Sequence, residues 1–480
     1  MATASSKGGV MMPGREAAVR TRRRLLGGSA GLAMLGYGAL AGCAPRSAAP
    51  QAGNTGAVAS QANAAMEAWC HADTRSAWQK VTLDDYNQEK GYGVTINWTK
   101  YSSAGEVADK LVVTMAAGSG FPDLADVEIS QMGKLLKTPT PPLVAFNDAL
   151  KGRENDFFKP SFVDPWTLNG KYYGLGNELN VCLLCYRHDL FDRVGIKAPL
   201  KTWDEVVEAG KRIAAVSPEG LFMVRTGTAG TFHMLAVAAG GGYLDKGVKL
   251  QLNQPANARA LQYLTDLIHK HRGASIIFGD RPEGDPGSAL FKDAVNTGKV
   301  AGELGPTWRI SGGMRVDAPD TGGQWMVQHM PQWGSSAGRV TTTWGGTGMT
   351  VLKESKFKEV AVDFVVWEHG TKAVLRDFEL RQVWPTYKKA YDDPRLTEPV
   401  PWFNNQRIGQ FLREGAETML PFHQGVWWPE ISSGAGKHIK AALMNEKPVT
   451  QALEEAQQEA RAAIENAGGV VGPDGQIQGI

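Results

Sequence analysis

Apolar positions along this chain recur with two periods, one close to two residues and one close to 3.6. Short apolar segments of strand length alternate with segments of helical spacing, such as Val107, Leu111 and Met115. Strands that alternate with helices are typical of βα units on a largely parallel sheet, so the pattern predicts an α/β fold. In the first half, the predicted elements are strands at 66–70, 94–98 and 123–127 and helices at 78–89 and around 107–115.

The same alternation returns in the second half of the chain. Thr202 can cap a helix in which Glu205 follows three residues later, which is the spacing of a capping box. Residues 257–271 and 449–467 predict two further helices with one apolar face each. The apolar faces are formed by Leu261, Leu264 and Ile268 in the first helix and by Leu453, Ala456, Ala460 and Ile464 in the second.

Residues 1–42 predict an export signal. Arg22, Arg23 and Arg24 precede a glycine-rich apolar run that ends at Leu40-Ala41-Gly42-Cys43. The start resembles a twin-arginine signal and the end resembles a bacterial lipobox, in which Cys43 becomes the lipidated first residue. The alternative is a poorly formed transmembrane anchor, but a span needs roughly 20 apolar residues. We therefore expect an extracytoplasmic protein held at the cell membrane by a lipid on Cys43.

The length and charge of the remaining chain limit its organisation and its partners. Residues 43–63 are rich in Ala, Gly, Ser, Pro and Gln and predict a flexible tether. The 438 residues after the signal exceed the usual size of a single core, so we expect two lobes. The whole chain has a net charge of +2, and residues 1–42 alone contribute +5. The remaining chain therefore has a net charge near −3, and it has no basic cluster. This balance predicts no nucleic-acid partner.

Three cysteines besides Cys43 are too few for a complete disulfide framework. Cys182 and Cys185 lie in the apolar run 181–186, which predicts a buried strand. Residues three apart on a strand point to opposite faces, so these thiols are poor partners for each other. A redox or zinc Cys-x-x-Cys site is the alternative, but the chain has no second cysteine pair.

Signatures of catalysis and of cofactor binding fail when their context is considered. The glycine–serine run at 27–31 fits a nucleophile elbow but lies in the export signal. The run 434–437 resembles a phosphate loop, but Ile431 replaces its first glycine and His438 its Ser or Thr. His269 and His271 are two apart on a helix and diverge. The sequence therefore predicts no metal and no cofactor, and it carries none of these catalytic motifs.

Aromatic and polar residues gather where predicted strands end and in loops rich in Gly and Pro. Aromatic rings pack on the C–H faces of sugars, and carboxylates and amides pair with hydroxyl groups. Ligands of open α/β sheets bind beyond the strand ends. The pattern thus favours a carbohydrate ligand. The candidate residues are His71, Asp73, Glu128, Ser130, Gln131, Glu178, Asn180, Thr231, His233, Trp308, Trp344, Trp427 and Trp428, with Trp402 as a weaker candidate.

Several segments resemble, in order, the extracytoplasmic solute-binding proteins of ABC transporters, in the sugar-binding branch that includes the maltose-binding protein. The most specific are Tyr186-Arg187-His188-Asp189-Leu190-Phe191 with Lys201-Thr202-Trp203-Asp204-Glu205, and Gly298-Lys299-Val300-Ala301 with Gly305-Pro306-Thr307-Trp308. Supporting segments are Ala68-Trp69-Cys70-His71-Ala72-Asp73, Phe121-Pro122-Asp123-Leu124, Gly345-Gly346, Phe364-Val365-Val366-Trp367 and Ala452-Leu453-Glu454-Glu455-Ala456-Gln457.

The resemblance implies a two-lobe periplasmic-binding-protein-like fold (type II), with a ligand cleft between lobes that close about a hinge. Carried onto this chain, it places the N-terminal lobe at 64–180 plus 326–365 and the C-terminal lobe at 181–325 plus 366–480. The first crossing between lobes falls near 177–183. It also implies a monomer that delivers its sugar to membrane permease subunits.

The resemblance assigns roles to the candidate residues. Asp73, at the polar turn after the first strand, accepts hydrogen bonds from sugar hydroxyls. Trp308, Trp344 and one of Trp427 or Trp428 are stacking platforms. Thr231 and His233 occupy a region where the family often has an aromatic contact, and this departure puts the identity of the ligand in doubt.

Two other functions stay open at this point. The same fold can bind a polyol, a glycerophosphodiester or another small polar solute, for which Arg225 or Arg309 could contact a phosphate. A secreted glycoside hydrolase also needs an aromatic cleft with two carboxylates, and Asp73, Glu128 and Glu178 could supply a pair.

Overall fold

The computed structural model describes residues 55–138, 140–216, 222–225, 230–246, 248–271, 275–278, 288–334 and 341–478. The export signal, Cys43 and the first part of the tether lie outside these residues. The described α-helices are α1 (Thr55–Ser60), α2 (Asp73–Lys90), α3 (Ala104–Ala117), α4 (Met132–Leu136), α5 (Asn147–Leu150), α6 (Lys159–Phe162), α7 (His188–Arg193), α8 (Trp203–Ile213), α9 (Gly230–Ala238), α10 (Pro255–His269), α11 (Ala289–Asn296), α12 (Met314–Asp317), α13 (Lys358–His369), α14 (Val374–Arg381), α15 (Pro394–Thr397), α16 (Ile408–Ala416), α17 (Trp428–Leu443) and α18 (Val449–Asn466).

The strands form one five-stranded sheet, one three-stranded sheet and several pairs. Their bounds are β1 (Ala65–Cys70), β2 (Thr95–Lys100), β3 (Leu124–Glu128), β4 (Thr167–Leu168), β5 (Lys171–Tyr172), β6 (Leu175–Gly176), β7 (Cys182–Arg187), β8 (Phe222–Arg225), β9 (Leu244–Asp245), β10 (Lys249–Leu250), β11 (Ser275–Phe278), β12 (Gly302–Pro306), β13 (Trp325–His329), β14 (Thr341–Thr342), β15 (Thr347–Val351), β16 (Met419–Leu420), β17 (Val470–Val471) and β18 (Ile477–Gln478).

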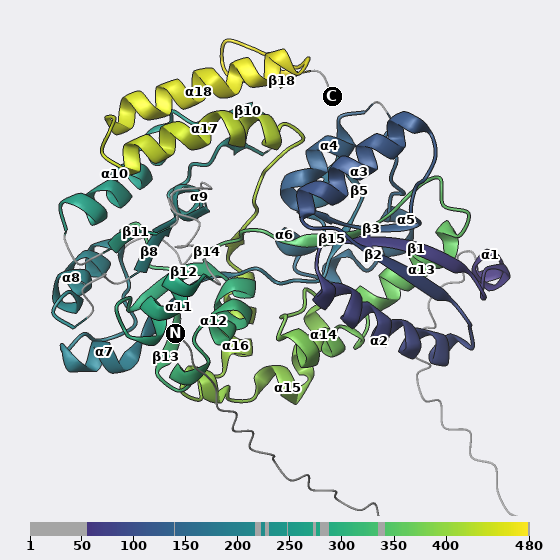
Figure 1. The fold of residues 1–480 in the computed structure, drawn as a ribbon, viewed down its shortest axis with the longest axis horizontal. Coiled ribbons are helices and arrows are strands. Elements are labelled where there is room, and N and C mark those ends of the chain that lie inside the picture. Colours follow the sequence, from purple (N-terminus) through teal and green to yellow (C-terminus); the bar gives the residue numbers. More distant parts are fainter. Residues whose placement is uncertain are drawn as a thin grey trace, which may run out of the picture. The chain divides into compact units, whose positions relative to one another are not determined.

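The first sheet has the strand order β2-β1-β3-β15-β6. β1 pairs in parallel with β2 and β3, which confirms the predicted βα units of the first half. β15 runs antiparallel to β3, with Thr347 opposite Glu128. β15 enters this sheet after the chain has built the second sheet, so no short crossover helix fixes its direction. In Figure 1, α2 and α14 lie on one side of this sheet and α3 and α4 on the other.

The second sheet, β12-β7-β13, is antiparallel throughout, so the expectation of largely parallel sheets is wrong for it. β7 is buried along its whole length, as the apolar run predicts. Its side chains alternate between two apolar cores: Cys182 packs with one and Cys185 with the other. The two thiols thus face opposite ways, as expected, and the described cysteines form no disulfide.

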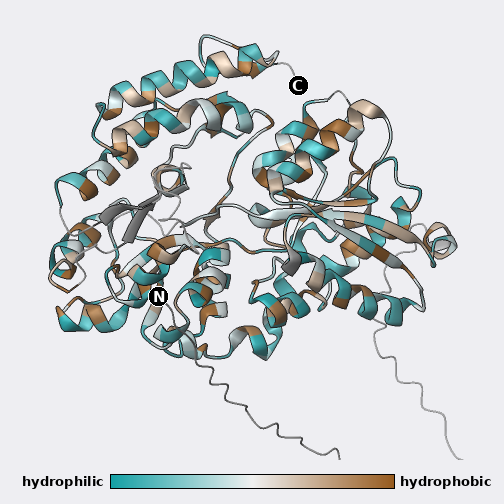
Figure 2. Cartoon of the chain, viewed as in Figure 1, coloured by the Kyte–Doolittle hydropathy of each residue, from teal (hydrophilic) through white to brown (hydrophobic). Residues whose placement is uncertain are grey.

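The predicted helices of the second half are confirmed within two residues at their ends. Thr202 caps α8 by accepting a hydrogen bond from the Glu205 backbone N–H at 3.2 Å, and the Glu205 carboxylate accepts one from the Lys201 N–H. In α18 the predicted apolar stripe is buried. Its other face is mostly hydrophilic, as Figure 2 shows. Helix stability here comes from burying one face against α17.

The last part of the predicted tether is folded, so its boundary at residue 63 is wrong. α1 lies within it and contacts α13. The Gln61 amide donates to Glu359 at 2.7 Å, and its oxygen accepts from the Val360 N–H at 3.1 Å. The second bond satisfies a backbone N–H that is otherwise free in the first turn of α13. A polar residue therefore anchors a segment whose composition alone gives no apolar face.

The proposed lobe boundaries remain a prediction, but two contacts bear on where they would fall. β13 pairs with β7, although residues 326–329 were assigned to the lobe that lacks β7. α14 packs against α2, although these helices were assigned to different lobes. No helix in the described part of the chain is long and apolar enough to cross a membrane.

Candidate functional site

The candidate site begins where β3 ends. Glu128 is the last residue of β3, and its carboxylate accepts hydrogen bonds from the backbone N–H of Ser130, at 2.9 Å, and from the Ser130 hydroxyl. Gln131 donates to the Ser130 oxygen at 2.9 Å. Burial raises the pKa of Glu128 to about 7, against the effect of the two bonds from Ser130. Three predicted residues therefore form one polar turn.

Asn180 and Trp308 meet at the glycine pair that precedes β15. The Asn180 amide donates to the carbonyl oxygen of Gly345 at 3.2 Å. The Trp308 indole N–H donates to the carbonyl oxygen of Trp344 at 3.2 Å, and 39% of the Trp308 residue surface is exposed. Gly345 has φ +71°, and a Cβ there would lie 3.0 Å from the Trp308 indole nitrogen. Glycine is thus required for Trp308 to approach this loop.

Trp344 is half-buried on a cluster of aromatic rings. It stacks on Phe422 at 5.0 Å between ring centroids and meets His233 at 5.3 Å and Trp428 at 6.3 Å. Burial lowers the pKa of His233 to about 3, so its ring is neutral near pH 7. Tyr243 stacks on Trp428 from behind. His233 and Trp428 therefore support the Trp344 ring.

His71 and Glu178 also belong to the surroundings of the Glu128 turn. Glu178 lies in segment 177–180, between β6 and β7, and its charge acts on both Glu128 and His71. Burial lowers the pKa of His71, although Asp126 opposes this shift. Asp73 is the first residue of α2, and its side chain lies outside the described side chains.

Six buried polar atoms of the predicted residues have no hydrogen-bond partner in the described part of the chain. They are His71 Nδ1, Gln131 Oε1, Asn180 Oδ1, both ring nitrogens of His233 and the indole nitrogen of Trp402. Leaving such an atom unpaired costs about 1–3 kcal/mol, so these atoms need water or a ligand. The first three belong to residues within or beside the Glu128 turn and segment 177–180, whereas His233 lies in the aromatic cluster and Trp402 stacks on Trp325.

Other candidates lie away from this group. Trp427 is buried under the Lys137 ammonium, 4.7 Å from the ring centroid, and it packs towards Gly469 rather than Trp344. Trp402 stacks on Trp325. Thr231 is buried in α9. Of the two phosphate candidates, Arg309 is held by Glu303 and Asp317 at 2.8 Å each, while the side chain of Arg225 lies outside the described residues.

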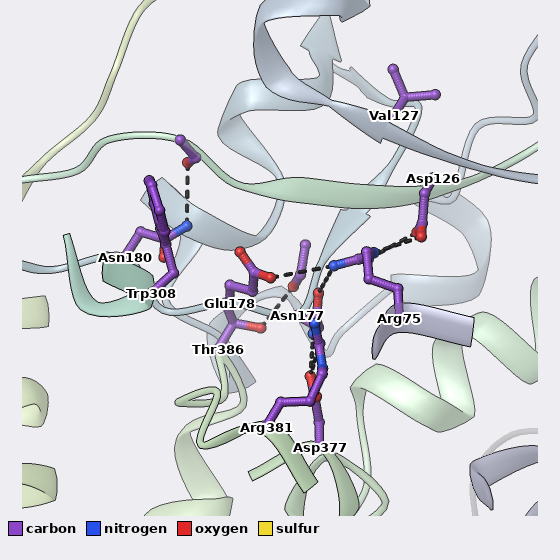
Figure 3. A network of polar contacts seen from close by, with 12 residues as sticks. Arg75, Asp126, Val127, Asn177, Glu178, Asn180, Trp308, Asp377, Arg381 and Thr386 are labelled. Carbon is purple, nitrogen blue, oxygen red and sulfur yellow. Dashed lines mark hydrogen bonds and ion pairs between the residues drawn. The ribbon is translucent and has the colours of Figure 1, made fainter. Parts of the chain in front are cut away.

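The sequence did not reveal the charged network beneath the site, which Figure 3 shows from close by. Arg75 contacts Asp126, Asn177 and Glu178, and Asp377 binds Asn177 and Arg381. Burial lowers the pKa of Arg75, but the carboxylates of Asp126, Glu178 and Asp377 together outweigh it, and the net shift is upward. Of these pairs, Asp377 and Arg381 are four residues apart on α14, but all the other partners are at least 51 residues apart in sequence, so no local pattern signals the network. Among the described residues, no group of His, Cys, Asp and Glu could hold a metal ion.

A close contact between α4 and Val426, just before α17, sets the distance between the Glu128 turn and Trp428. A Cβ on Gly133 would lie 2.2 Å from the Val426 carbonyl oxygen, a distance that real Cβ atoms do not show. Lys137, just after α4, forms an ion pair with Glu430 of α17. The contact fixes Trp428 relative to the Glu128 turn, because α17 also touches residues 129–131.

Replacing Gly133 with alanine is expected to push α4 away from Val426. The overpacking should destabilise the protein by about 1–3 kcal/mol and shift Trp428 relative to the Glu128 turn. Thermal unfolding and ligand affinity, measured on one preparation, test both effects. The matched control is Gly436→Ala in α17, where the new Cβ meets nothing within 4 Å. It should be neutral or stabilising. An unchanged melting temperature in Gly133→Ala would refute the steric argument.

Comparison with known proteins places the chain in a family. The model of the bacterial extracellular solute-binding proteins matches residues 81–401. The chain belongs to this family. This confirms the resemblance inferred from the sequence motifs.

Relatives of this solute-binding protein carry names of sugar-binding proteins. It is 30% identical over 270 residues to the arabinooligosaccharide-binding protein of Bacillus subtilis, covering 56% of this chain and 60% of that one. That match spans less than two thirds of the relative. The arabinooligosaccharide-binding protein of Halalkalibacterium halodurans is 25% identical over 364 residues, covering 75% and 80%. The lactose-binding protein of Rhizobium radiobacter is 23% identical over 385 residues, covering 77% and 86%.

Solved structures show the fold of this solute-binding protein. The galacto-N-biose-/lacto-N-biose I-binding protein of the ABC transporter from Bifidobacterium longum is similar, with TM-score 0.67, 20% identity, and coverage of 85% of this chain and 98% of that one. The cyclic alpha-maltosyl-1,6-maltose binding protein from Arthrobacter globiformis has TM-score 0.67, 20% identity, and coverage of 84% and 99%. The expected two-lobe, type II α/β fold is confirmed.

Proposed function

We propose that this solute-binding protein captures a mono- or oligosaccharide for an ABC importer. One observation carries the proposal: the loop 344–346, against which Trp308 packs, is bonded to the polar turn, and beside it Gln131 Oε1 and Asn180 Oδ1 are buried without a hydrogen-bond partner among the described residues. Rings can pack on the C–H faces of a sugar, while Glu128, Gln131 and Asn180 pair with its hydroxyl groups. The relatives named for arabinooligosaccharides and lactose support this ligand class.

The ligand favours the closed form only by its greater affinity for that state. Closure excludes water, so each hydroxyl that pairs with Glu128 or Asn180 counts for more. The loaded form then delivers the sugar unchanged to the permease subunits. We further propose that the protein is a monomer, is not an enzyme, and is held outside the cytoplasm by a lipid on Cys43.

A thermal-shift screen with the purified protein tests the proposal. Arabinooligosaccharides, lactose and maltodextrins are compared with a polyol and a glycerophosphodiester. A ligand that binds only the folded state at 100 times its Kd adds about 2.7 kcal/mol to the free energy of unfolding. We expect a saccharide to raise the melting temperature and to be recovered intact by chromatography. A shift with the polyol or the phosphodiester alone, or cleavage of a glycoside, would replace the proposal with that alternative.

A further inference from the structure

We propose that Arg75 is a positioning residue for the ligand site, which holds segment 177–180 so that Glu178 and Asn180 face the sugar. The inference rests on the proposed function, because it takes these two side chains as ligand contacts. Arg75 lies in the first part of α2 and is 2% exposed, so it contacts the ligand only through its neighbours.

The Arg75 guanidinium binds β3 and segment 177–180 at once. Its Nε and Nη2 donate to the two oxygens of Asp126 at 2.5 and 2.8 Å. Its Nη1 donates to Asn177 Oδ1 and to Glu178 Oε1, at 3.3 Å each. Asp126 lies on β3 two residues before Glu128. One side chain therefore sets the distance between the Glu128 turn and Glu178.

The segment is also held from its opposite side by residues that follow α14. The Leu179 N–H donates to the Trp384 carbonyl at 2.7 Å, and the Thr386 hydroxyl donates to the Gly176 carbonyl at 2.9 Å. The Asn177 amide donates to Asp377, which Arg381 binds through two nitrogens. The backbone is thus fixed at its two ends, and Arg75 fixes the side chains between them.

Lysine at position 75 cannot make the contacts that Arg75 makes. A guanidinium presents five donors in a planar fork, whereas an ammonium is a compact charge without a fork. Lysine at position 75 would keep the charge that Asp126 requires, but it would not hold Asp126, Asn177 and Glu178 in one geometry. Arg75→Lys therefore separates positioning from charge compensation.

A thermodynamic cycle tests the proposal on the purified protein with its best saccharide. We expect Arg75→Lys to weaken binding by about tenfold or more, and to cost much less in a Glu178→Gln background, since contacting residues are coupled. Equal losses in both backgrounds would overturn the proposal. The matched control is Arg376→Lys, which also alters an Arg–Asp pair between α14 and α2, with Asp85 at 2.8 Å, but at the surface. It should leave affinity unchanged.

A second measurement needs no sugar and keeps the test separate from the proposed function. Hydrogen–deuterium exchange of the Leu179 amide in the free protein should become faster in Arg75→Lys and stay unchanged in Arg376→Lys. If Arg75→Lys does not fold, the double variant Asn177→Ala/Glu178→Ala removes both bonds from Arg75 to the segment and leaves the Arg75–Asp126 pair, and it should speed the same exchange. Unchanged exchange in the folded variants would overturn the proposal, whether or not the protein binds a sugar.

Discussion

Glu368→Gln should make the protein more stable than the wild type, by a margin that grows with pH. Glu368 lies at the end of α13 and is fully buried. Burial raises its pKa from 4.5 to about 8, although the hydrogen bond from Thr82 opposes this. Its second oxygen, Oε2, has no hydrogen-bond partner among the described residues. Glutamine keeps the oxygen that Thr82 requires and removes the charge.

The wild type loses stability as the pH rises because its folded state holds a proton on Glu368 that the unfolded chain releases. Between about pH 4.5 and pH 8 the folded protein keeps a proton on Glu368 that the unfolded chain has lost. The stabilisation is complete below the unfolded pKa and is lost as the pH rises through the folded pKa. At 1.36 kcal/mol per pKa unit, the advantage of Glu368→Gln should grow by about 2–3 kcal/mol from pH 6 to pH 9.

Urea unfolding at several pH values measures this difference. Exposed Glu446 provides the control, since Glu446→Gln should follow the wild-type curve at every pH. Parallel curves for Glu368→Gln and the wild type would show that Glu368 does not hold a proton in the folded state. Glu128, whose pKa is also raised, affects both proteins equally and cancels in the comparison.

Trp344→Ala is expected to cause the largest loss of sugar affinity. The substitution removes the ring that stacks on Phe422 and leaves the backbone carbonyl that accepts from Trp308. Loss of a stacking face and of the exposed apolar surface should cost about 1–3 kcal/mol of binding, or about 5- to 150-fold in Kd. Calorimetric titration with the saccharide found in the screen measures it.

Two variants separate a ligand platform from general packing. Trp344→Phe keeps a ring and should lose less affinity than Trp344→Ala. Trp402→Ala removes another half-buried indole, stacked on Trp325 at 6.1 Å between ring centroids, and should lower stability while leaving affinity intact. Should Trp402→Ala weaken binding and Trp344→Ala spare it, the platform assignment would be wrong.

Local sequence patterns predicted most elements because those elements depend on neighbouring residues. The strand at 66–70 and the helix at 449–467 are found within one residue of their expected ends. The same patterns did not predict features that depend on contacts between segments far apart in the sequence. The antiparallel direction of β15 and the folding of residues 55–61 depend on partners more than 200 residues away.

The charged network under the site shows the same limit. Arg75 and Asp126 are 51 residues apart, and Asn177 and Asp377 are 200 apart. A buried arginine in a helix has no periodic signature, and its function depends on which carboxylates the fold brings to it. Glu368 and His369 were missed for the same reason, since they end an apolar helix.

The sequence by itself determined the elements, the residue types available for a sugar site, and the family. Only the tertiary structure decided which of them lie together. Successive residues near a helix start point about 100° apart, so Trp428 reaches the Trp344 ring while Trp427 turns towards Lys137 and Gly469. Trp308 meets Trp344 because Gly345 leaves room for the indole. The spacing of residues along the chain predicts neither the Trp428–Trp344 contact nor the Trp308–Trp344 contact, because both depend on how separate elements pack.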